Sequence, residues 1–143
     1  MNHSRFISLL GAVALGLSGT IAVGSPALAV SCYGDYCSGQ DPEASGCSAD
    51  ATTTASARIW GTYSYIELRW SPTCKTNWAR VPASWGTSYP SQVQAFQCAT
   101  GYNQSGVSAS NASYSWSRMI YSPKLGVSAR WTGAPGYTST ACA

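Results

Sequence analysis

The sequence predicts a mainly β domain: a small disulfide-stapled sandwich or barrel with an irregular, cross-linked segment at its N-terminal end. Three observations support this fold class. Six cysteines follow an apolar leader, and short runs rich in Thr, Tyr, Trp and Val are each bounded by Gly, Pro, Asn or Ser. In addition, no stretch of the chain has the length and the apolar spacing of an amphipathic helix.

The first 29 residues have the parts of a secretory signal peptide. His3 and Arg5 form a basic start, an apolar run extends from Phe6 to about Val23, and Ala27-Leu28-Ala29 is a small-x-small cleavage site. We expect residues 30–143 to form a single secreted, extracellular domain, because no second apolar segment approaches the roughly 20 residues of a membrane span. Since the chain has 1 histidine, and it lies in the leader, the mature chain lacks a Ser-His-Asp triad, a Cys-His pair and a His-ligated metal.

The six cysteines predict three disulfides, because an even number in an exported chain is typical of a disulfide framework. About fifteen pairings are possible, and the sequence does not choose among them. We expect neighbours to pair, as Cys32–Cys37, Cys47–Cys74 and Cys98–Cys142. The second bridge would pin the N-terminal segment to a turn, and the third would tie a strand to the C-terminus. The spacing matches neither a zinc knuckle nor a Cys-x-x-Cys redox centre, so we expect no metal and no cofactor.

The first half of the domain is expected to contain a loop or helical turn followed by three strands. Cys32 to about Asp50 has no periodicity. The next two runs, Ala51–Trp60 and Tyr63–Trp70, predict a hairpin with its turn at Gly61-Thr62. The second run alternates, so one face should be buried and the other should carry charge: Ile66, Leu68 and Trp70 against Glu67 and Arg69.

A turn at Ser71–Cys74 ends this strand, and a third strand is expected over Asn77–Val81. Four more short apolar-aromatic runs follow: Val93–Cys98, Tyr114–Tyr121, Val127–Trp131 and Tyr137–Cys142. Short strands at intervals of roughly 8–12 residues are typical of an all-β sandwich or barrel.

Four charged residues are expected to form a structural charge cluster on the polar face of these strands. Glu67 and Arg69 lie two residues apart on one strand, and Asp50 and Arg80 come close to them if consecutive strands pair. Arg grips a carboxylate bidentately, so such a cluster satisfies its own charges. The alternative is a cluster that recognises a ligand.

Three of the five mature carboxylates, Asp41, Glu43 and Asp50, fall within ten positions. Asp41-Pro42 favours a turn or a helix cap. Two other interpretations stay open: calcium binding by hard oxygen ligands, and a catalytic acid.

The tryptophans divide into expected core residues and one candidate contact residue. Trp70 and Trp78 are expected in the core. Trp85 lies among Ser, Gly, Thr and Pro, and we take Trp85 and Tyr89, within the low-charge segment Pro82–Tyr102, as candidate ligand-binding residues on a surface loop. The alternative is that Trp85 folds back over one end of the core.

Ordered motifs in the first half resemble a known family. They are Cys37-Ser-Gly39-Gln-Asp41-Pro42, Cys47-Ser-Ala-Asp50-Ala51, Glu67-Leu68-Arg69-Trp70-Ser71-Pro72-Thr-Cys74 and Trp78-Ala79-Arg80. The chain thereby resembles the YjfA-like family of exported bacterial proteins, a domain of unknown function. This resemblance implies an exported domain, in some members joined across a membrane span to a cytoplasmic regulatory domain, and it implies no known activity.

Three alternative functions are compatible with these observations. The first is a secreted, non-enzymatic module that binds a cell-wall or other extracellular carbohydrate or peptide. The second is a secreted inhibitor or toxin-like effector that acts on another protein, and the third is a carboxylate-based cell-wall hydrolase. Nucleic-acid binding is not indicated, because the 8 Lys and Arg residues are scattered rather than gathered in a basic run.

Overall fold

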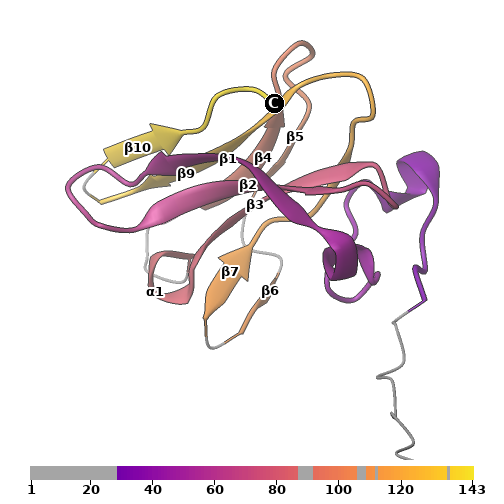
Figure 1. Ribbon diagram of the computed structural model, residues 1–143. Coiled ribbons are helices and arrows are strands. Elements are labelled where there is room, and N and C mark those ends of the chain that lie inside the picture. Colours follow the sequence, from indigo (N-terminus) through magenta and orange to yellow (C-terminus); the bar gives the residue numbers. More distant parts are fainter. Residues whose placement is uncertain (1–28, 87–91, 106–108, 112, 135) are drawn as a thin grey trace, which may run out of the picture.

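Two antiparallel sheets pack face to face (Figure 1). The computed structural model describes residues 29–86, 92–105, 109–111, 113–134 and 136–143. One sheet has six strands: β1 (Thr52–Arg58), β2 (Tyr65–Ser71), β3 (Thr76–Pro82), β6 (Ala109–Ser110), β7 (Tyr114–Trp116) and β8 (Ile120–Tyr121). The other has four strands: β4 (Gln92–Gln97), β5 (Asn103–Ser105), β9 (Val127–Gly133) and β10 (Gly136–Ser139). The predicted mainly β fold is confirmed.

The main core lies between the two sheets. Ile66 and Leu68 of β2 face it from one side, and Val93 and Ala95 of β4 face it from the other, all with no exposed surface. The period of two on β2 therefore buries the predicted face. Trp70 differs from the prediction, because it stands at the rim of the sandwich and is only partly buried.

The β1–β2 connection is longer than the expected two-residue turn. The Ile59 amide donates to the Ser64 carbonyl at 2.8 Å, and the Thr62 amide donates to the Ile59 carbonyl at 3.1 Å. Gly61 has a positive φ of 74°, which suits glycine. Because Ile59 is fully buried, it anchors the base of this loop in the core.

The run predicted as one strand over Tyr114–Tyr121 is divided into β7 and β8. Between them the backbone of Met119 leaves the sheet and pairs with the N-terminal segment. The Met119 amide donates to the Gln40 carbonyl at 3.0 Å, and the Gly39 amide donates to the Met119 carbonyl at 2.9 Å. A long-range contact, which periodicity cannot reveal, therefore interrupts the strand.

The N-terminal segment contains two 3₁₀ helices, η1 (Gly34–Cys37) and η2 (Cys47–Asp50), and covers part of the outer face of the six-stranded sheet. A second hydrophobic cluster lies beneath it, comprising Cys37, Cys47, Cys74, Trp78, Trp116 and Met119. Trp78 is buried as predicted, though in this second cluster rather than between the sheets.

The three expected disulfides are present. They are Cys32–Cys37, Cys47–Cys74 and Cys98–Cys142, with Cα–Cα distances of 5.2, 5.8 and 6.4 Å. The second joins η2 to the β2–β3 turn, and the third joins the end of β4 to the segment after β10. The second and third bridges thus link residues 27 and 44 positions apart, whereas the first closes a short loop within the N-terminal segment.

Candidate binding surface

Two of the four residues expected in the charge cluster form an ion pair. Glu67 of β2 lies opposite Arg80 of β3. The Arg80 guanidinium donates to Glu67 Oε2 through Nη2 at 2.6 Å and through Nε at 2.7 Å. The guanidinium also lies over the Tyr114 ring, 4.1 Å from its centroid. Both charged side chains are about a quarter exposed, so the pair braces neighbouring strands at the surface.

Arg69 was expected to contact a carboxylate, but its partners are neutral oxygen atoms. Its guanidinium donates to Thr53 Oγ1 and to the Ala51 carbonyl, both at 2.6 Å. Burial lowers the pKa of Arg69, and the positive charge of Arg80 lowers it further. Arg69 therefore joins β2 to the start of β1 instead of completing a charge cluster.

Asp50 stabilises a turn and is separate from the Arg80–Glu67 pair. Its carboxylate accepts from Ser71 Oγ at 2.6 Å and from the Thr73 amide at 3.0 Å. Burial raises the pKa of Asp50, but the hydrogen bonds from Ser71 and Thr73 outweigh it and hold the pKa below its usual value. Asp50 thus fixes η2 to the β2–β3 turn.

Asp41 and Glu43 also accept hydrogen bonds from nearby protein donors. Asp41 Oδ1 accepts from the amides of Glu43 and Ala44 at 2.9 Å each, and Asp41 Oδ2 accepts from Trp116 Nε1 at 2.9 Å. Glu43 Oε2 accepts from Ser48 Oγ at 2.7 Å. This geometry agrees with the turn or cap interpretation of Asp41.

These two carboxylates line an open hollow of about 550 Å³ together with Trp116 and Arg118. Among the described residues, the His, Cys, Asp and Glu side chains that lie close enough together to share a metal ion are cysteines, and no carboxylate is among them. Asp41, Glu43 and Asp50 are thus not brought together around one point, as a calcium site would require.

Trp85 is packed against the core rather than presented to solvent. It lies in the short helix α1 (Ala83–Gly86), and its ring meets that of Trp131 edge-on, with centroids 5.7 Å apart. Its Nε1 donates to Ser64 Oγ at 2.8 Å, and its carbonyl accepts from Trp131 Nε1 at 3.0 Å. The alternative, in which Trp85 covers one end of the core, agrees with this geometry. Tyr89 lies outside the described residues.

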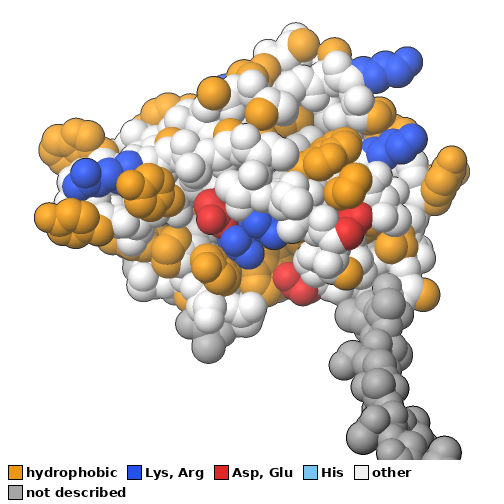
Figure 2. Space-filling view, in the orientation of Figure 1, with side chains coloured by type: hydrophobic (Ala, Val, Ile, Leu, Met, Phe, Trp, Pro, Cys, Tyr) orange, Lys and Arg blue, Asp and Glu red, His pale blue; other side chains and the backbone are white. Residues whose placement is uncertain are grey.

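A group of exposed aromatic side chains lies instead at the β1–β2 hairpin. Trp60 is 67% exposed, Tyr63 91%, Tyr65 50%, and Tyr137 of β10 55%. Tyr65 precedes the buried Ile66 and Tyr137 precedes the buried Thr138, so these two tyrosines lie on the outer faces of different sheets. We call Trp60, Tyr63 and Tyr65 the hairpin aromatic surface. The Arg58 guanidinium lies over the Tyr63 ring, 5.0 Å from its centroid. Figure 2 shows hydrophobic side chains gathered around basic atoms at the end of the molecule where Figure 1 places this hairpin.

Hydrogen bonds hold the hairpin loop in one shape. Thr62 Oγ1 donates to the Ile59 carbonyl at 2.8 Å and accepts from the Ser64 amide at 3.0 Å. The Trp60 amide donates to Thr138 Oγ1 at 3.3 Å, which connects the loop to β10. The exposed rings therefore stand on a braced scaffold, and a ligand would not have to order the loop.

This surface was not among the predicted binding residues, although the sequence contains a signal for it. Trp60, Tyr63 and Tyr65 fall within six positions at a predicted turn. Side chains at a turn between two strands cannot all face one core, so some of these rings had to be exposed.

A second hollow, of about 380 Å³, lies at the rim where Trp70 is partly exposed. Its lining includes Thr54, Asn77, Lys124 and Leu125. It is a competing location for a small ligand, because it combines an aromatic side chain with a few polar groups.

Comparison with known proteins identifies the family but no activity. Neither the curated proteins nor the solved structures include a match. Among the residues that the structure describes, no helix is long and apolar enough to cross a membrane. A family model described as "Protein of unknown function (DUF2690)" matches residues 35–130, which span most of η1, all of η2, β1 to β8 and the first half of β9, but not β10. The chain therefore belongs to the DUF2690 family, an uncharacterised domain family.

Proposed function

We propose that this protein is an exported, non-enzymatic module that binds cell-wall glycan through the hairpin aromatic surface. Export is supported by the leader over residues 1–29 and by three disulfides, which are typical of oxidising compartments. The motifs between Cys37 and Arg80 resemble those of the YjfA-like exported proteins, which also supports export.

The observation that carries this proposal is the exposure of three aromatic rings, Trp60, Tyr63 and Tyr65, at the β1–β2 hairpin. Rings of Trp and Tyr offer a large contact area with little loss of side-chain freedom, and they are enriched where proteins bind. The apolar face of a pyranose ring packs on such a ring, while its hydroxyls bond to hydroxyl and guanidinium groups. Tyr63, Tyr65 and Arg58 supply these groups here.

Few charged side chains lie near this surface. Arg58 lies over Tyr63, and its Nε donates to the Thr62 carbonyl. Glu67, two positions from Tyr65 on the same strand, is neutralised by Arg80. Arg58 contributes a positive charge here, but no run of basic residues surrounds it, so the surface suits a glycan better than a nucleic acid.

The two alternative functions have less support. An inhibitor needs a rigid, protruding loop, whereas the cross-linked N-terminal segment lies over Trp78 and Trp116 and buries them. A hydrolase needs two carboxylates free to act on substrate, whereas Asp41 and Glu43 accept the hydrogen bonds of a turn.

The test is retention of the purified, oxidised protein on insoluble cell-wall sacculi. Tyr63→Ala/Tyr65→Ala should weaken retention by roughly tenfold or more, since each lost ring contact is worth about 1 kcal/mol. Tyr33→Ala/Tyr36→Ala is the matched control, because it also removes two exposed tyrosines, 89% and 86% exposed, but from the η1 region. It should bind like the wild type.

Two further arms identify the ligand and the site. Digestion of the glycan strands should abolish retention, whereas removal of the stem peptides should not. Equal retention of both tyrosine variants would disprove the role of the hairpin aromatic surface, and a loss confined to Trp70→Ala would place binding in the rim hollow. A wild-type protein that ignores sacculi but captures a single secreted protein would favour the inhibitor alternative.

A further inference from the structure

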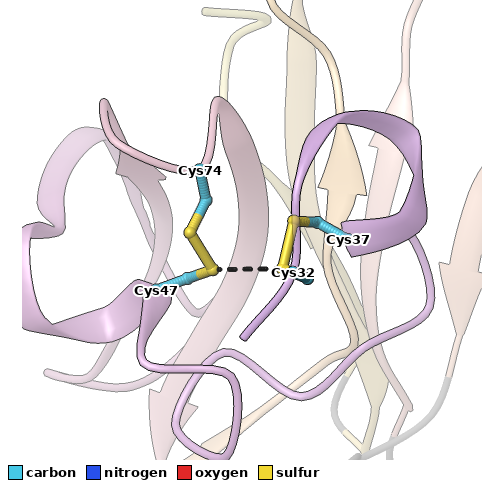
Figure 3. Close-up of side chains that lie close together, drawn as sticks. All are labelled: Cys32, Cys37, Cys47 and Cys74. Atoms are coloured by element: carbon cyan, nitrogen blue, oxygen red, sulfur yellow. Dashed lines mark hydrogen bonds between the residues drawn. A yellow bond between two sulfur atoms is a disulfide. The ribbon is translucent and has the colours of Figure 1, made fainter. Parts of the chain in front are cut away.

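Four sulfur atoms from two separate disulfides meet beneath the N-terminal segment (Figure 3). The Sγ atoms of Cys32, Cys37, Cys47 and Cys74 all lie within 4.8 Å of one another. The closest approach between the two bridges joins Cys32 Sγ and Cys47 Sγ at 3.6 Å, the dashed line in the figure. Since both atoms belong to disulfides, neither carries a hydrogen, and this is a packing contact.

The site is enclosed by apolar side chains. Cys37 and Cys47 are fully buried, Cys74 is almost so, and Cys32 is partly buried. Trp78, Trp116 and Met119 pack in the same cluster. These apolar side chains limit the access of water to the four sulfurs.

Contacts other than the bridges hold the three segments that carry these cysteines. Asp50 bonds to Ser71 and Thr73 beside the β2–β3 turn, and the Cys74 amide donates to Ser71 Oγ at 3.1 Å. Asp41 bonds to Trp116, and the Gly39 and Met119 backbones pair. These contacts do not require oxidised sulfur, so the four side chains should stay together when the bridges are reduced.

We propose that this four-cysteine cluster binds one thiophilic divalent cation of the Zn²⁺ class when both bridges are reduced. Reduction of the two disulfides takes four electrons from a thiol reductant, which also supplies four protons and becomes a disulfide, or from a phosphine, which becomes its oxide while water supplies the protons; either route yields four thiols. Binding of the ion as a tetrathiolate then releases these protons. Tetrahedral Zn–S bonds of about 2.3 Å place the sulfurs roughly 3.8 Å apart.

That spacing falls within the range the structure already provides. The two bridges touch at 3.6 Å, and no pair of sulfurs exceeds 4.8 Å. The sulfurs of each former bridge must separate by roughly 1.7 Å, and the most distant sulfurs must approach by up to about 1 Å, both of which side-chain rotation supplies. Spacing along the chain gave no zinc pattern, because the ligands come from three segments rather than from one or two knuckles.

The test is an anaerobic titration of the reduced protein with Co²⁺, followed by Zn²⁺. We expect saturation at one Co²⁺ per chain, with the visible d–d bands and the sulfur-to-cobalt charge-transfer band of a tetrahedral tetrathiolate. One equivalent of Zn²⁺ should abolish these bands. Absence of a saturable tetrathiolate spectrum would overturn the proposal.

Two double variants, each retaining four of the six cysteines, provide a matched comparison. Cys98→Ser/Cys142→Ser leaves the cluster intact and should give the wild-type spectrum. Cys32→Ser/Cys37→Ser removes half of it and should not. Identical spectra from the two variants would overturn the proposal even if both variants unfold, because binding would then not depend on this cluster.

Alkylation of the wild-type protein gives an independent readout. With Zn²⁺ bound, Cys98 and Cys142 should be alkylated rapidly while the four cluster cysteines are protected, which peptide mass spectrometry resolves. Equal protection of all six cysteines, or of none, would contradict the assignment.

Discussion

Trp116 Nε1 donates a hydrogen bond of 2.9 Å to Asp41 Oδ2 and thereby joins β7 to the N-terminal segment, 75 positions away in the chain. The other oxygen of Asp41 accepts from the amides of Glu43 and Ala44. One carboxylate therefore caps a local turn and holds that turn against the outer face of the six-stranded sheet. The segment that encloses the four sulfurs depends on this arrangement.

Asp41→Ala should therefore destabilise the oxidised protein by about 2 kcal/mol, because it removes a cap and leaves a largely buried indole N–H without this acceptor. Urea unfolding followed by tryptophan fluorescence measures the change. Glu43→Ala is the control, since Glu43 is exposed and should cost no more than about 0.5 kcal/mol. Equal midpoints for the two variants would show that Asp41 does not hold the segment.

The lowered pKa of Asp50 predicts a pH-dependent contribution to stability. A carboxylate with a lower pKa in the folded state stabilises the fold above its unfolded pKa, near 3.8, and loses this effect as the pH falls through the folded value. Asp50→Asn should be less stable than the wild type at pH 7, and the difference should shrink below about pH 4. Urea unfolding from pH 7 to pH 2 measures it. A difference that is constant across this range would mean that charge on Asp50 plays no part.

Trp85→Ala should act on stability rather than on binding. Because the indole packs edge-on against Trp131 and donates to Ser64, its loss should cost about 2 kcal/mol, less than for a fully buried Trp. Trp60→Ala removes an exposed indole and should change stability by less than about 0.5 kcal/mol. If Trp85→Ala kept its melting temperature but lost retention on sacculi, Trp85 would be a contact residue after all.

The signal-peptide interpretation of residues 1–29 predicts the N-terminus of the released protein, which mass spectrometry can test. Cleavage between Ala29 and Val30 should give a released chain that begins Val-Ser-Cys, because Ala27-Leu28-Ala29 follows the apolar run. Intact mass of the protein from culture medium measures the N-terminus. A released protein that still contained residues 1–29 would contradict the signal-peptide interpretation.

Local pattern predicted the longer strands β1 to β4, β9 and β10, but not the short strands β5 and β6. The alternation in β2 identified Ile66 and Leu68 as core residues and placed Glu67 on the opposite face, because the side-chain period of a strand is two. The cysteine count predicted three bridges, and the pairing of neighbours matches the structure. Strand alternation is visible within a few residues, and each bridge joins two cysteines that are consecutive in the list of six.

Tertiary structure decided which side chains are exposed and which segments meet. Trp85 and Trp60 both lie beside turn residues, yet one packs on Trp131 and the other is exposed, because a distant strand covers only the first. Contacts between Met119 and the N-terminal segment divide a predicted strand in two. The four sulfurs converge because three segments fold onto one face of a sheet. These outcomes depend on packing between parts of the chain that are far apart in sequence, which neither spacing nor composition encodes.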